Sequence, residues 1–265
     1  MDLQLNGKKA LVSGSTAGIG LAIATALASE GATVIVAGRS EQKLQAARKA
    51  VQSPSVHKAD VVALPVDLGT AEGVETMIRS VPEVDILVNN LGIYEAKSFF
   101  DLQDSDWMRL FEINVMSGVR LARHYLRGML QRNFGRIIFI SSESAIMTPP
   151  EMIHYGFTKS AQLAIARGLA ELTKGTKVTV NSVLPGPTLS EGVVDFLKSM
   201  SSKPEPTPQE AEKEFFEKHR SSSLLQRLID PGEIASLTAF IASPLSSATN
   251  GAALRAEGGL VRSIY

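Results

Sequence analysis

A tyrosine and a lysine four residues apart, Tyr155 and Lys159, are the pair in this sequence best suited to acid–base chemistry. On a helix, residues with this spacing share one face, so the two side chains would lie side by side. A free tyrosine has a pKa of about 10, too high for easy proton exchange at neutral pH. A neighbouring ammonium would lower that pKa, so the pair predicts a tyrosine that donates and accepts protons.

A serine upstream of the tyrosine could bind the oxygen of a substrate. Ser142 follows an apolar run, 137–140, which is typical of a buried strand. Ser141 competes for the role, but neighbouring strand residues point to opposite faces, so only one of the two can face a site. Glu143 comes next, and either contacts the substrate or is solvated.

A glycine-rich turn near the N-terminus has the residues of a phosphate-binding site. An expected strand runs into this turn, and an expected helix follows it. Such glycines permit a tight turn and a close approach of the backbone to a ligand, while the helix offers N–H groups to a pyrophosphate. No lysine follows the last glycine, which excludes a nucleotide-hydrolysing P-loop. The candidate residues are Gly14, Ser15, Thr16, Gly18, Ile19 and Gly20.

The end of the second expected strand indicates which cofactor binds. An NAD site needs an acidic residue there for the ribose hydroxyls, and this chain has Gly38 followed by Arg39 and Ser40. A guanidinium can pair with a 2′-phosphate and stack on adenine, and a serine hydroxyl can add a donor. We therefore expect NADP(H) rather than NAD(H). The alternative is that Arg39 is a solvated residue that opens the next helix.

The elements that must position these residues alternate along the chain. Near-continuous apolar strands separated by helices predict a parallel sheet covered on both faces. Right-handed crossovers then give a doubly wound, three-layer α/β fold with a mostly or wholly parallel seven-stranded sheet. Strands are expected at 9–13, 33–37, 61–66, 85–89, 136–141, 177–183 and 252–255, and helices at 19–29, 41–51, 71–79, 155–174 and 231–242, with one long or broken helical region at 105–131.

Composition excludes several classes of partner. The 265 residues carry 27 basic and 27 acidic side chains, so no net charge attracts nucleic acid or anionic lipid. There is no cysteine, and no His, Asp or Glu cluster has the spacing of a metal site. The chain has no signal-peptide pattern and no apolar run approaching the ~20 residues of a membrane span. We expect one cytoplasmic domain over 1–265 without metal, nucleic-acid or membrane partners.

One segment, 189–223, interrupts the alternation of strands and helices. It is rich in proline and charge, and leaves the carboxyl end of the sixth strand, where open α/β sheets bind ligands. We predict that it forms a substrate lid inserted in the domain. The alternative is a solvated insertion.

Together these motifs resemble the short-chain dehydrogenase/reductase family, in its shorter type, over nearly the whole chain. The glycines match the family's TGxxxGxG signature, with Ser13 in place of threonine. The resemblance implies a Rossmann fold and selects Ser142 rather than Ser141. It also implies these site residues: Asp67 and Leu68 at the adenine, Asn90, Leu91 and Gly92 in an NNAG-like turn, Asn114, Ser142, Tyr155 and Lys159 in catalysis, and Pro185, Gly186 and Thr188 at the carboxamide.

The resemblance also implies a role for each catalytic residue. Tyr155 would donate the proton, Ser142 would polarise the substrate oxygen, and Lys159 would tune the tyrosine and hold the nicotinamide ribose. The backbone of Asn114 would hold a water that relays protons to Lys159. The pro-S hydride would pass between nicotinamide C4 and the substrate carbon.

Two neighbours of these motifs depart from the family pattern or need an interpretation. Leu91 replaces the small residue of the NNAG turn and would add bulk beside the ribose. His154 precedes Tyr155 on the expected helix and points away from the tyrosine face, so we expect a structural role.

The expected function is an NADP(H)-dependent oxidoreductase that interconverts a small-molecule carbonyl and alcohol, and the resemblance implies a homodimer or homotetramer through the two long helices. A 3-oxoacyl-carrier-protein reductase is one alternative. A non-catalytic cofactor-binding regulator is another, although it has no need of all three catalytic residues. The carrier alternative depends on arginines that could dock an acidic partner but could equally be solvated or subunit-facing: Arg120, Arg123, Arg127 and Arg132.

Overall fold

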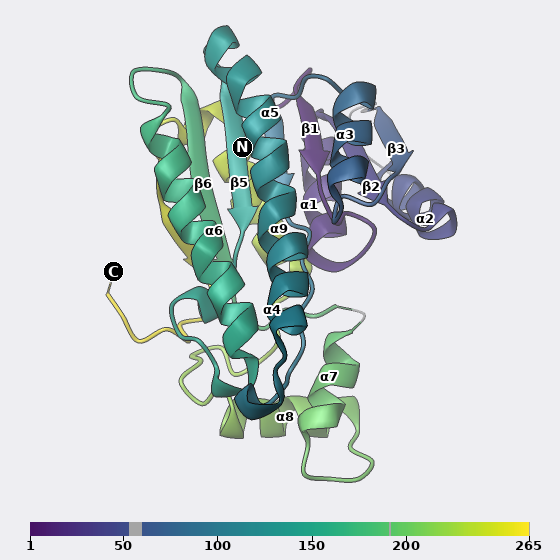
Figure 1. The fold of residues 1–265 in the computed structure, drawn as a ribbon, viewed down its shortest axis with the longest axis vertical. Coiled ribbons are helices and arrows are strands. Elements are labelled where there is room, and N and C mark those ends of the chain that lie inside the picture. Colours follow the sequence, from purple (N-terminus) through teal and green to yellow (C-terminus); the bar gives the residue numbers. More distant parts are fainter. Residues whose placement is uncertain (53–59, 191, 265) are drawn as a thin grey trace.

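The computed structural model describes residues 1–52, 60–190 and 192–264. Its centre is a seven-stranded sheet in the order β3-β2-β1-β4-β5-β6-β7, in which every neighbouring pair is parallel (Figure 1). This confirms the predicted doubly wound α/β fold with a parallel seven-stranded sheet. The strands are β1 Lys9–Val12, β2 Thr33–Gly38, β3 Val61–Pro65, β4 Ile86–Asn89, β5 Gly135–Ile140, β6 Val178–Pro185 and β7 Ala253–Ala256.

Helices cover both faces of the sheet, as the near-continuous apolar strands require. One face holds α1 Gly18–Ser29, α2 Glu41–Gln52 and α9 Pro231–Ala242, and the other holds α3 Ala71–Ser80, α5 Ser117–Arg132 and α6 Ile153–Glu171. The remaining helices are α4 Asp104–Phe111, α7 Val193–Met200 and α8 Pro208–Lys218. Short turns of helix are η1 Phe99–Asp101, η2 Glu112–Met116, η3 Glu143–Ala145, η4 Pro150–Met152 and η5 Pro244–Ser246. No helix in the described part of the chain is long and apolar enough to cross a membrane.

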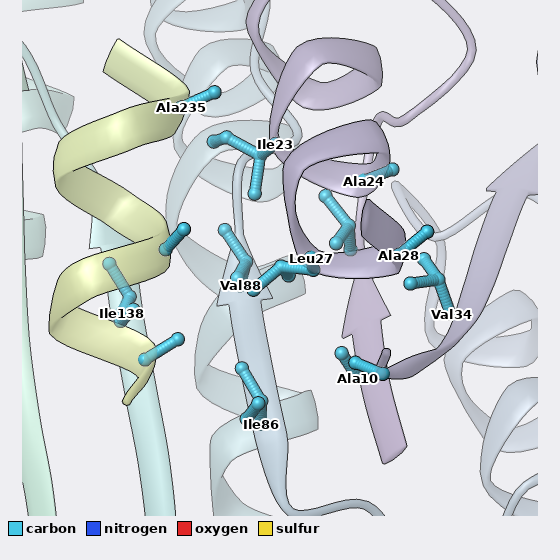
Figure 2. Close-up of a cluster of buried hydrophobic side chains, with 14 of the residues drawn as sticks. Ala10, Ile23, Ala24, Leu27, Ala28, Val34, Ile86, Val88, Ile138 and Ala235 are labelled. Atoms are coloured by element: carbon cyan, nitrogen blue, oxygen red, sulfur yellow. The ribbon is translucent and has the colours of Figure 1, made fainter. Parts of the chain in front are cut away.

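Side chains alternate between two hydrophobic cores, one on each face of the sheet. Figure 2 shows the first core, where Leu27 of α1 lies near Val88 of β4 and Ala235 of α9 lies near Ile23 of α1. The alanine-rich surfaces of α1 and α9 let these two helices approach each other closely. The second core lies under α3, α5 and α6.

The winding of the chain reverses next to β1, which pairs with β2 on one side and β4 on the other. Ligands of open α/β sheets bind in the crevice outside the carboxyl ends of the strands at such a reversal. The glycine-rich turn leaves β1 at this point. The fold therefore places the predicted phosphate-binding residues at the topologically expected edge.

The segment 189–223 forms α7 and α8, which lie beyond the carboxyl ends of the strands (Figure 1). Thr207 and Glu210 form a capping box that begins α8, with Pro208 at the first helical position. The two helices share a small core of their own, separate from the two main cores: Val193, Leu197, Ala211, Phe215 and Phe216. Glu191 lies outside the described residues.

Candidate active site

A cavity of about 420 Å³ opens where β1, β4, β5 and β6 end. Its walls come from the loops after these strands, from α6 and from the 189–223 segment. Most of the predicted site residues meet in it. Those that line it are Gly14, Gly18, Ile19, Gly20, Asn90, Gly92, Ser142, Tyr155, Lys159, Pro185, Gly186 and Thr188.

The glycine-rich turn is held tightly against the loop after β4. Gly14 has a φ of +63°, and a Cβ there would lie 3.0 Å from the Leu91 Cα. A Cβ on Gly20 would lie 2.3 Å from the Gly14 carbonyl oxygen, so a larger residue is excluded. The Ser13 hydroxyl accepts the N–H groups of Asn90 and Leu91, at 2.9 and 3.0 Å. Serine in place of the signature threonine thus ties the two loops together.

The N-terminus of α1 is suited to an anion. Its N-cap, Ala17, has no capping side chain, and the first turn has no acidic residue. Ala17, Gly18, Ile19 and Gly20 all line the cavity. Uncapped N–H groups and the positive end of the helix dipole therefore meet the cavity, which fits the pyrophosphate of a dinucleotide cofactor.

The predicted adenine-end residues lie outside the lining of the cavity, at the ends of β2 and β3. The Arg39 guanidinium is largely exposed and lies 4.0 Å from the Asp67 carboxylate. A Cβ on Gly38 would lie 2.5 Å from the Thr16 Cγ2, so an acidic side chain cannot occupy that position unless the threonine moves.

Four other predicted cofactor-binding residues, Ser15, Ser40, Leu68 and Leu91, make structural contacts. The Ser15 hydroxyl accepts the Ala37 N–H at 3.1 Å, and the Ser40 hydroxyl accepts the Lys43 N–H at 3.4 Å. Leu68 is buried in the second core, and Leu91 packs against the same core. Leu91 is not among the residues that line the cavity. The expectation that its bulk narrows the site is therefore wrong, because the side chain turns into the core.

The structure brings the predicted serine, tyrosine and lysine together at the cavity. Tyr155 and Lys159 lie on one face of α6, with the lysine Nζ 5.6 Å from the centre of the tyrosine ring. Lys159 Nζ also donates to the Ile140 carbonyl at 2.9 Å. Ser141 donates to the Lys159 carbonyl at 2.9 Å and so fastens α6 to the end of β5.

The charges of the site are set by burial. Burial raises the pKa of Tyr155 above its ordinary value, the Glu143 charge adds to the rise, and the neighbouring Ser142 hydroxyl opposes it. Burial lowers the pKa of Lys159 to about 8, although the Glu143 charge opposes the shift. The expected lowering of the tyrosine pKa is therefore not found. The lysine Nζ is held by the Ile140 carbonyl, and desolvation of the phenolate is the largest cause of the rise.

Glu143 is 5% exposed, so the solvated interpretation of this residue is wrong. Its Oε2 accepts the Ser142 hydroxyl at 2.5 Å, and its Oε1 accepts the Ser144 hydroxyl at 3.2 Å. Arg220, from the segment after α8, brings its Nε to 3.6 Å from Oε1. A buried carboxylate therefore lies beside the predicted catalytic serine, and both Glu143 and Arg220 line the cavity.

Asn114 lies in η2, a π-helical turn between α4 and α5, within the region predicted to be one long or broken helix. Its side chain brackets the backbone of Ile93, accepting from the N–H at 2.8 Å and donating to the carbonyl at 2.9 Å. Its own carbonyl accepts from Gln162 Nε2 at 2.6 Å, and Gln162 Oε1 accepts from Lys159 Nζ at 3.3 Å. Gln162 thus links the Lys159 ammonium to the Asn114 carbonyl, and the water relay between these two residues stays a prediction.

Several site residues were not singled out from the sequence. Gln162 follows Lys159 by three positions, a helical spacing that could have identified it. Tyr94 packs edge-on against Tyr155 at 6.3 Å and against Phe196 of α7 at 5.8 Å. These contacts join segments far apart in sequence, so no local pattern indicates them.

Thr188 and His154 make structural contacts near the cavity. The Thr188 hydroxyl donates to the Gly186 carbonyl at 2.8 Å, which shapes the turn after β6. His154 is fully buried, packs on Trp107 at 6.1 Å and is not among the residues that line the cavity. Burial lowers the pKa of His154, so its ring is uncharged at neutral pH and has a structural role in packing.

The parallel sheet, its reversal beside β1 and the cavity at that edge define the class of nucleotide-binding α/β oxidoreductases. Residues 8–200 match the family model described as short chain dehydrogenase. The chain belongs to the short-chain dehydrogenase/reductase family.

Three similar proteins illustrate the range of the family. An uncharacterized oxidoreductase of Bacillus subtilis, YvaG, is 54% identical over the full length of both chains. The 3-oxoacyl-[acyl-carrier-protein] reductase FabG of Aquifex aeolicus is 30% identical, over 98% of this chain and 100% of its own. The crystal structure of L-sorbose reductase from Gluconobacter frateurii, complexed with NADPH and L-sorbose, is 29% identical with a TM-score of 0.93 over all of both chains.

Proposed function

We propose that this protein is an NADP(H)-dependent oxidoreductase that interconverts a small-molecule carbonyl and an alcohol. The observation that carries the proposal is that Ser142, Tyr155 and Lys159 line the same cavity as the glycine-rich turn. A nicotinamide cofactor bound by that turn would supply or accept a hydride, with the pro-S hydrogen transferred. The NADPH complex of L-sorbose reductase supports this choice of cofactor.

Each of the three residues has a distinct task in the proposed reaction. The Ser142 hydroxyl donates to the substrate oxygen and fixes its position. The Tyr155 hydroxyl passes its proton to that oxygen during reduction and takes it back during oxidation. The Lys159 ammonium holds the nicotinamide ribose and stabilises the phenolate that forms, a charge-assisted interaction strengthened by the buried site.

The test is a titration of the purified protein with NADPH and NADH, followed by a screen of carbonyl compounds. We expect tighter binding of NADPH, and oxidation of NADPH in the presence of a ketone or aldehyde. The Tyr155→Phe variant should bind NADPH normally and lose turnover by about 10²–10⁴-fold. Turnover that survives this substitution would contradict the mechanism, and turnover absent from the native protein would favour a non-catalytic regulator.

Arg39 and Gly38 support the preference for NADP(H). Arg39 is free to turn toward a 2′-phosphate because its pairing with Asp67 is exposed and long, and such pairs contribute little energy. Arg39→Ala should weaken NADPH binding about tenfold and leave NADH binding unchanged. An equal loss for both cofactors would contradict this role.

The segment 189–223 is proposed to be the substrate lid. Val193 and Phe196 of α7, Phe215 of α8 and Arg220 beyond it contribute to the wall of the cavity. The segment thus forms part of the wall of the cavity.

A carrier-protein reductase remains the second candidate, supported by the similarity to FabG. Of the four arginines, Arg120 pairs with Glu112 and Arg132 pairs with Glu83. Arg123 and Arg127 are exposed on α5. Reversing both charges should raise KM for a carrier-bound substrate and leave a free thioester analogue unaffected; equal effects would contradict docking.

A further inference from the structure

Glu143 is a buried carboxylate in the wall of the cavity. The proposed proton transfer does not involve it. Its two oxygens have different partners. Oε1 faces Ser144 and Arg220, whereas Oε2 accepts only the Ser142 hydroxyl among the hydrogen bonds of the described residues. Arg220 is itself 7% exposed and is also paired with Glu151 at 3.2 Å. The positive charge on the Oε1 side compensates the burial of the carboxylate, and leaves Oε2 dependent on the serine.

The single proton of Ser142 cannot serve two acceptors at once. In the structure it is donated to Glu143 Oε2 at 2.5 Å. In the proposed reaction the same proton must be donated to the substrate oxygen, because a hydroxyl has one donor. Glu143 Oε2 would then lose its partner while remaining buried, and an unpaired buried charged group is costly.

We propose that the substrate itself supplies the missing donor, as a hydroxyl on the carbon next to its carbonyl, and that Glu143 is the residue that recognises it. Because Ser142 Oγ and Glu143 Oε2 lie 2.5 Å apart, the replacement donor must lie close to the carbonyl oxygen. A hydroxyl on the adjacent carbon meets this requirement. A carboxylate at the same place would be repelled by Glu143. The substrate class is therefore the α-hydroxy ketones and aldehydes.

This inference rests on the proposed function, and a set of matched ketones tests it separately. Open-chain 2-hydroxy ketones of three to six carbons are each compared with two analogues. In one the hydroxyl is replaced by methyl, which keeps the size. In the other it is a methyl ether, which keeps the electron withdrawal but cannot donate. We expect kcat/KM to be about 10- to 100-fold higher for the hydroxy ketone than for either analogue, since a hydrogen bond to a charged group has this effect.

Glu143→Gln keeps the shape of the side chain and removes the charge. It should reduce the preference for the hydroxy ketone about three- to tenfold, because a neutral acceptor binds a hydroxyl about half as strongly. Glu151→Gln is the matched control, since it removes the same charge beside Arg220 without contacting Ser142. The control should keep the native preference.

The outcomes separate the two proposals. If the native protein reduces the analogues as well as the hydroxy ketones, and Tyr155→Phe abolishes all of it, this inference is wrong and the proposed function stands. If Glu143→Gln keeps the full preference, the assignment to Glu143 is wrong. If no ketone is reduced with either cofactor, the proposed function fails and this inference with it. Should Glu143→Gln not fold, the comparison of the three ketones with the native protein still tests the proposed substrate class.

Discussion

At the scale of single residues, burial decides which groups of the site are charged. Lys159 is buried with a carbonyl and an amide oxygen as partners, and its pKa falls to about 8. Tyr155 is protonated at neutral pH because burial raises its pKa above the ordinary value. In carbonyl reduction the tyrosine must give up that proton, so the lysine has to be charged at that moment.

The pH dependence of reduction should therefore report Lys159. We expect kcat/KM for a ketone to fall as the pH rises through about 8, where the lysine loses its proton and can no longer stabilise the phenolate. Glu143→Gln should move this midpoint to lower pH, because the Glu143 charge raises the lysine pKa. A pH profile measured from pH 6 to pH 10 checks both statements. A midpoint that stays in place in Glu143→Gln would contradict the electrostatic coupling.

The meeting of Ser142, Tyr155 and Lys159 at one cavity was predictable from the sequence because most of its signal is local. Tyr155 and Lys159 share a helix face by their spacing, whereas the choice of Ser142 over Ser141 came from the family resemblance. The pairing of Glu143 with Arg220 was not predictable. It joins positions far apart in the chain, and only the folded path of the 189–223 segment brings the arginine to the serine.

At the scale of elements, the lysine is positioned by three of them: β5, η2 and α6. The carbonyl of Ile140 ends β5, and Gln162 links Lys159 to the carbonyl of Asn114 in η2. A π-helical turn leaves backbone carbonyls without their regular partners, which is why η2 can offer one to a side chain. The helical break was not predicted in detail, because apolar periodicity continues through it.

Gln162→Leu should lower kcat about tenfold. The Asn114 carbonyl loses its donor and Lys159 loses an acceptor, at a cost of about 1–3 kcal/mol in the free energy of unfolding. If Gln162 had a structural role only, its replacement would change the free energy of unfolding and leave the pH profile of the reaction unchanged. We therefore expect the midpoint of the pH profile to fall in Gln162→Leu and to rise in Gln162→Glu, whose carboxylate would favour the charged lysine. Identical midpoints in the two variants would contradict a positioning role.

Removing an apolar side chain from the small core of α7 and α8 should loosen these two helices and leave the sheet and its covering helices folded. Phe215 is 4% exposed in their small core, and its replacement by alanine costs about 3–5 kcal/mol there. Phe215→Ala should raise KM for the ketone and speed proteolysis near 201–206. Fluorescence of Trp107, on α4, should show an unchanged global transition. Phe240→Ala, on the partly exposed α9 surface, is the control that should alter neither.

At the scale of the whole molecule, an aromatic surface on α4 and α6 is the candidate for assembly. Phe157 stacks on Phe111 and packs on Trp107, yet it is 47% exposed, and Met108 beside them is 63% exposed. We propose that this surface joins subunits of a homodimer or homotetramer, since exposed apolar groups of this size mark interaction sites.

Phe157→Glu should reduce the assembly to a smaller species, because the interface would have to bury a charge without a partner. Light scattering coupled to size-exclusion chromatography measures the mass of both proteins. Val62→Glu, at an exposed position of β3, introduces the same charge on another element and should keep the native mass. A native protein that is monomeric would contradict the proposal outright.

The fold was predictable at this scale and the substrate was not. Strand and helix periodicities follow from the residues themselves, so the sheet and the edge that carries the site follow as well. The shape of the cavity depends on how Tyr94, from the loop after β4, meets Phe196 and Arg220 of the segment 189–223. Such convergence is a property of tertiary packing, which local sequence patterns do not encode.

The independent core of α7 and α8 has a consequence for how such proteins diversify. The described contacts between the segment and the body of the molecule include the Arg220 ion pairs, the Tyr94–Phe196 ring contact and the hydrogen bond from the Ser222 hydroxyl to the Leu260 carbonyl. A unit that folds around its own apolar residues can be exchanged whole without disturbing the sheet. Grafting 189–223 between relatives is thus a natural route to new selectivity with the chemistry left in place.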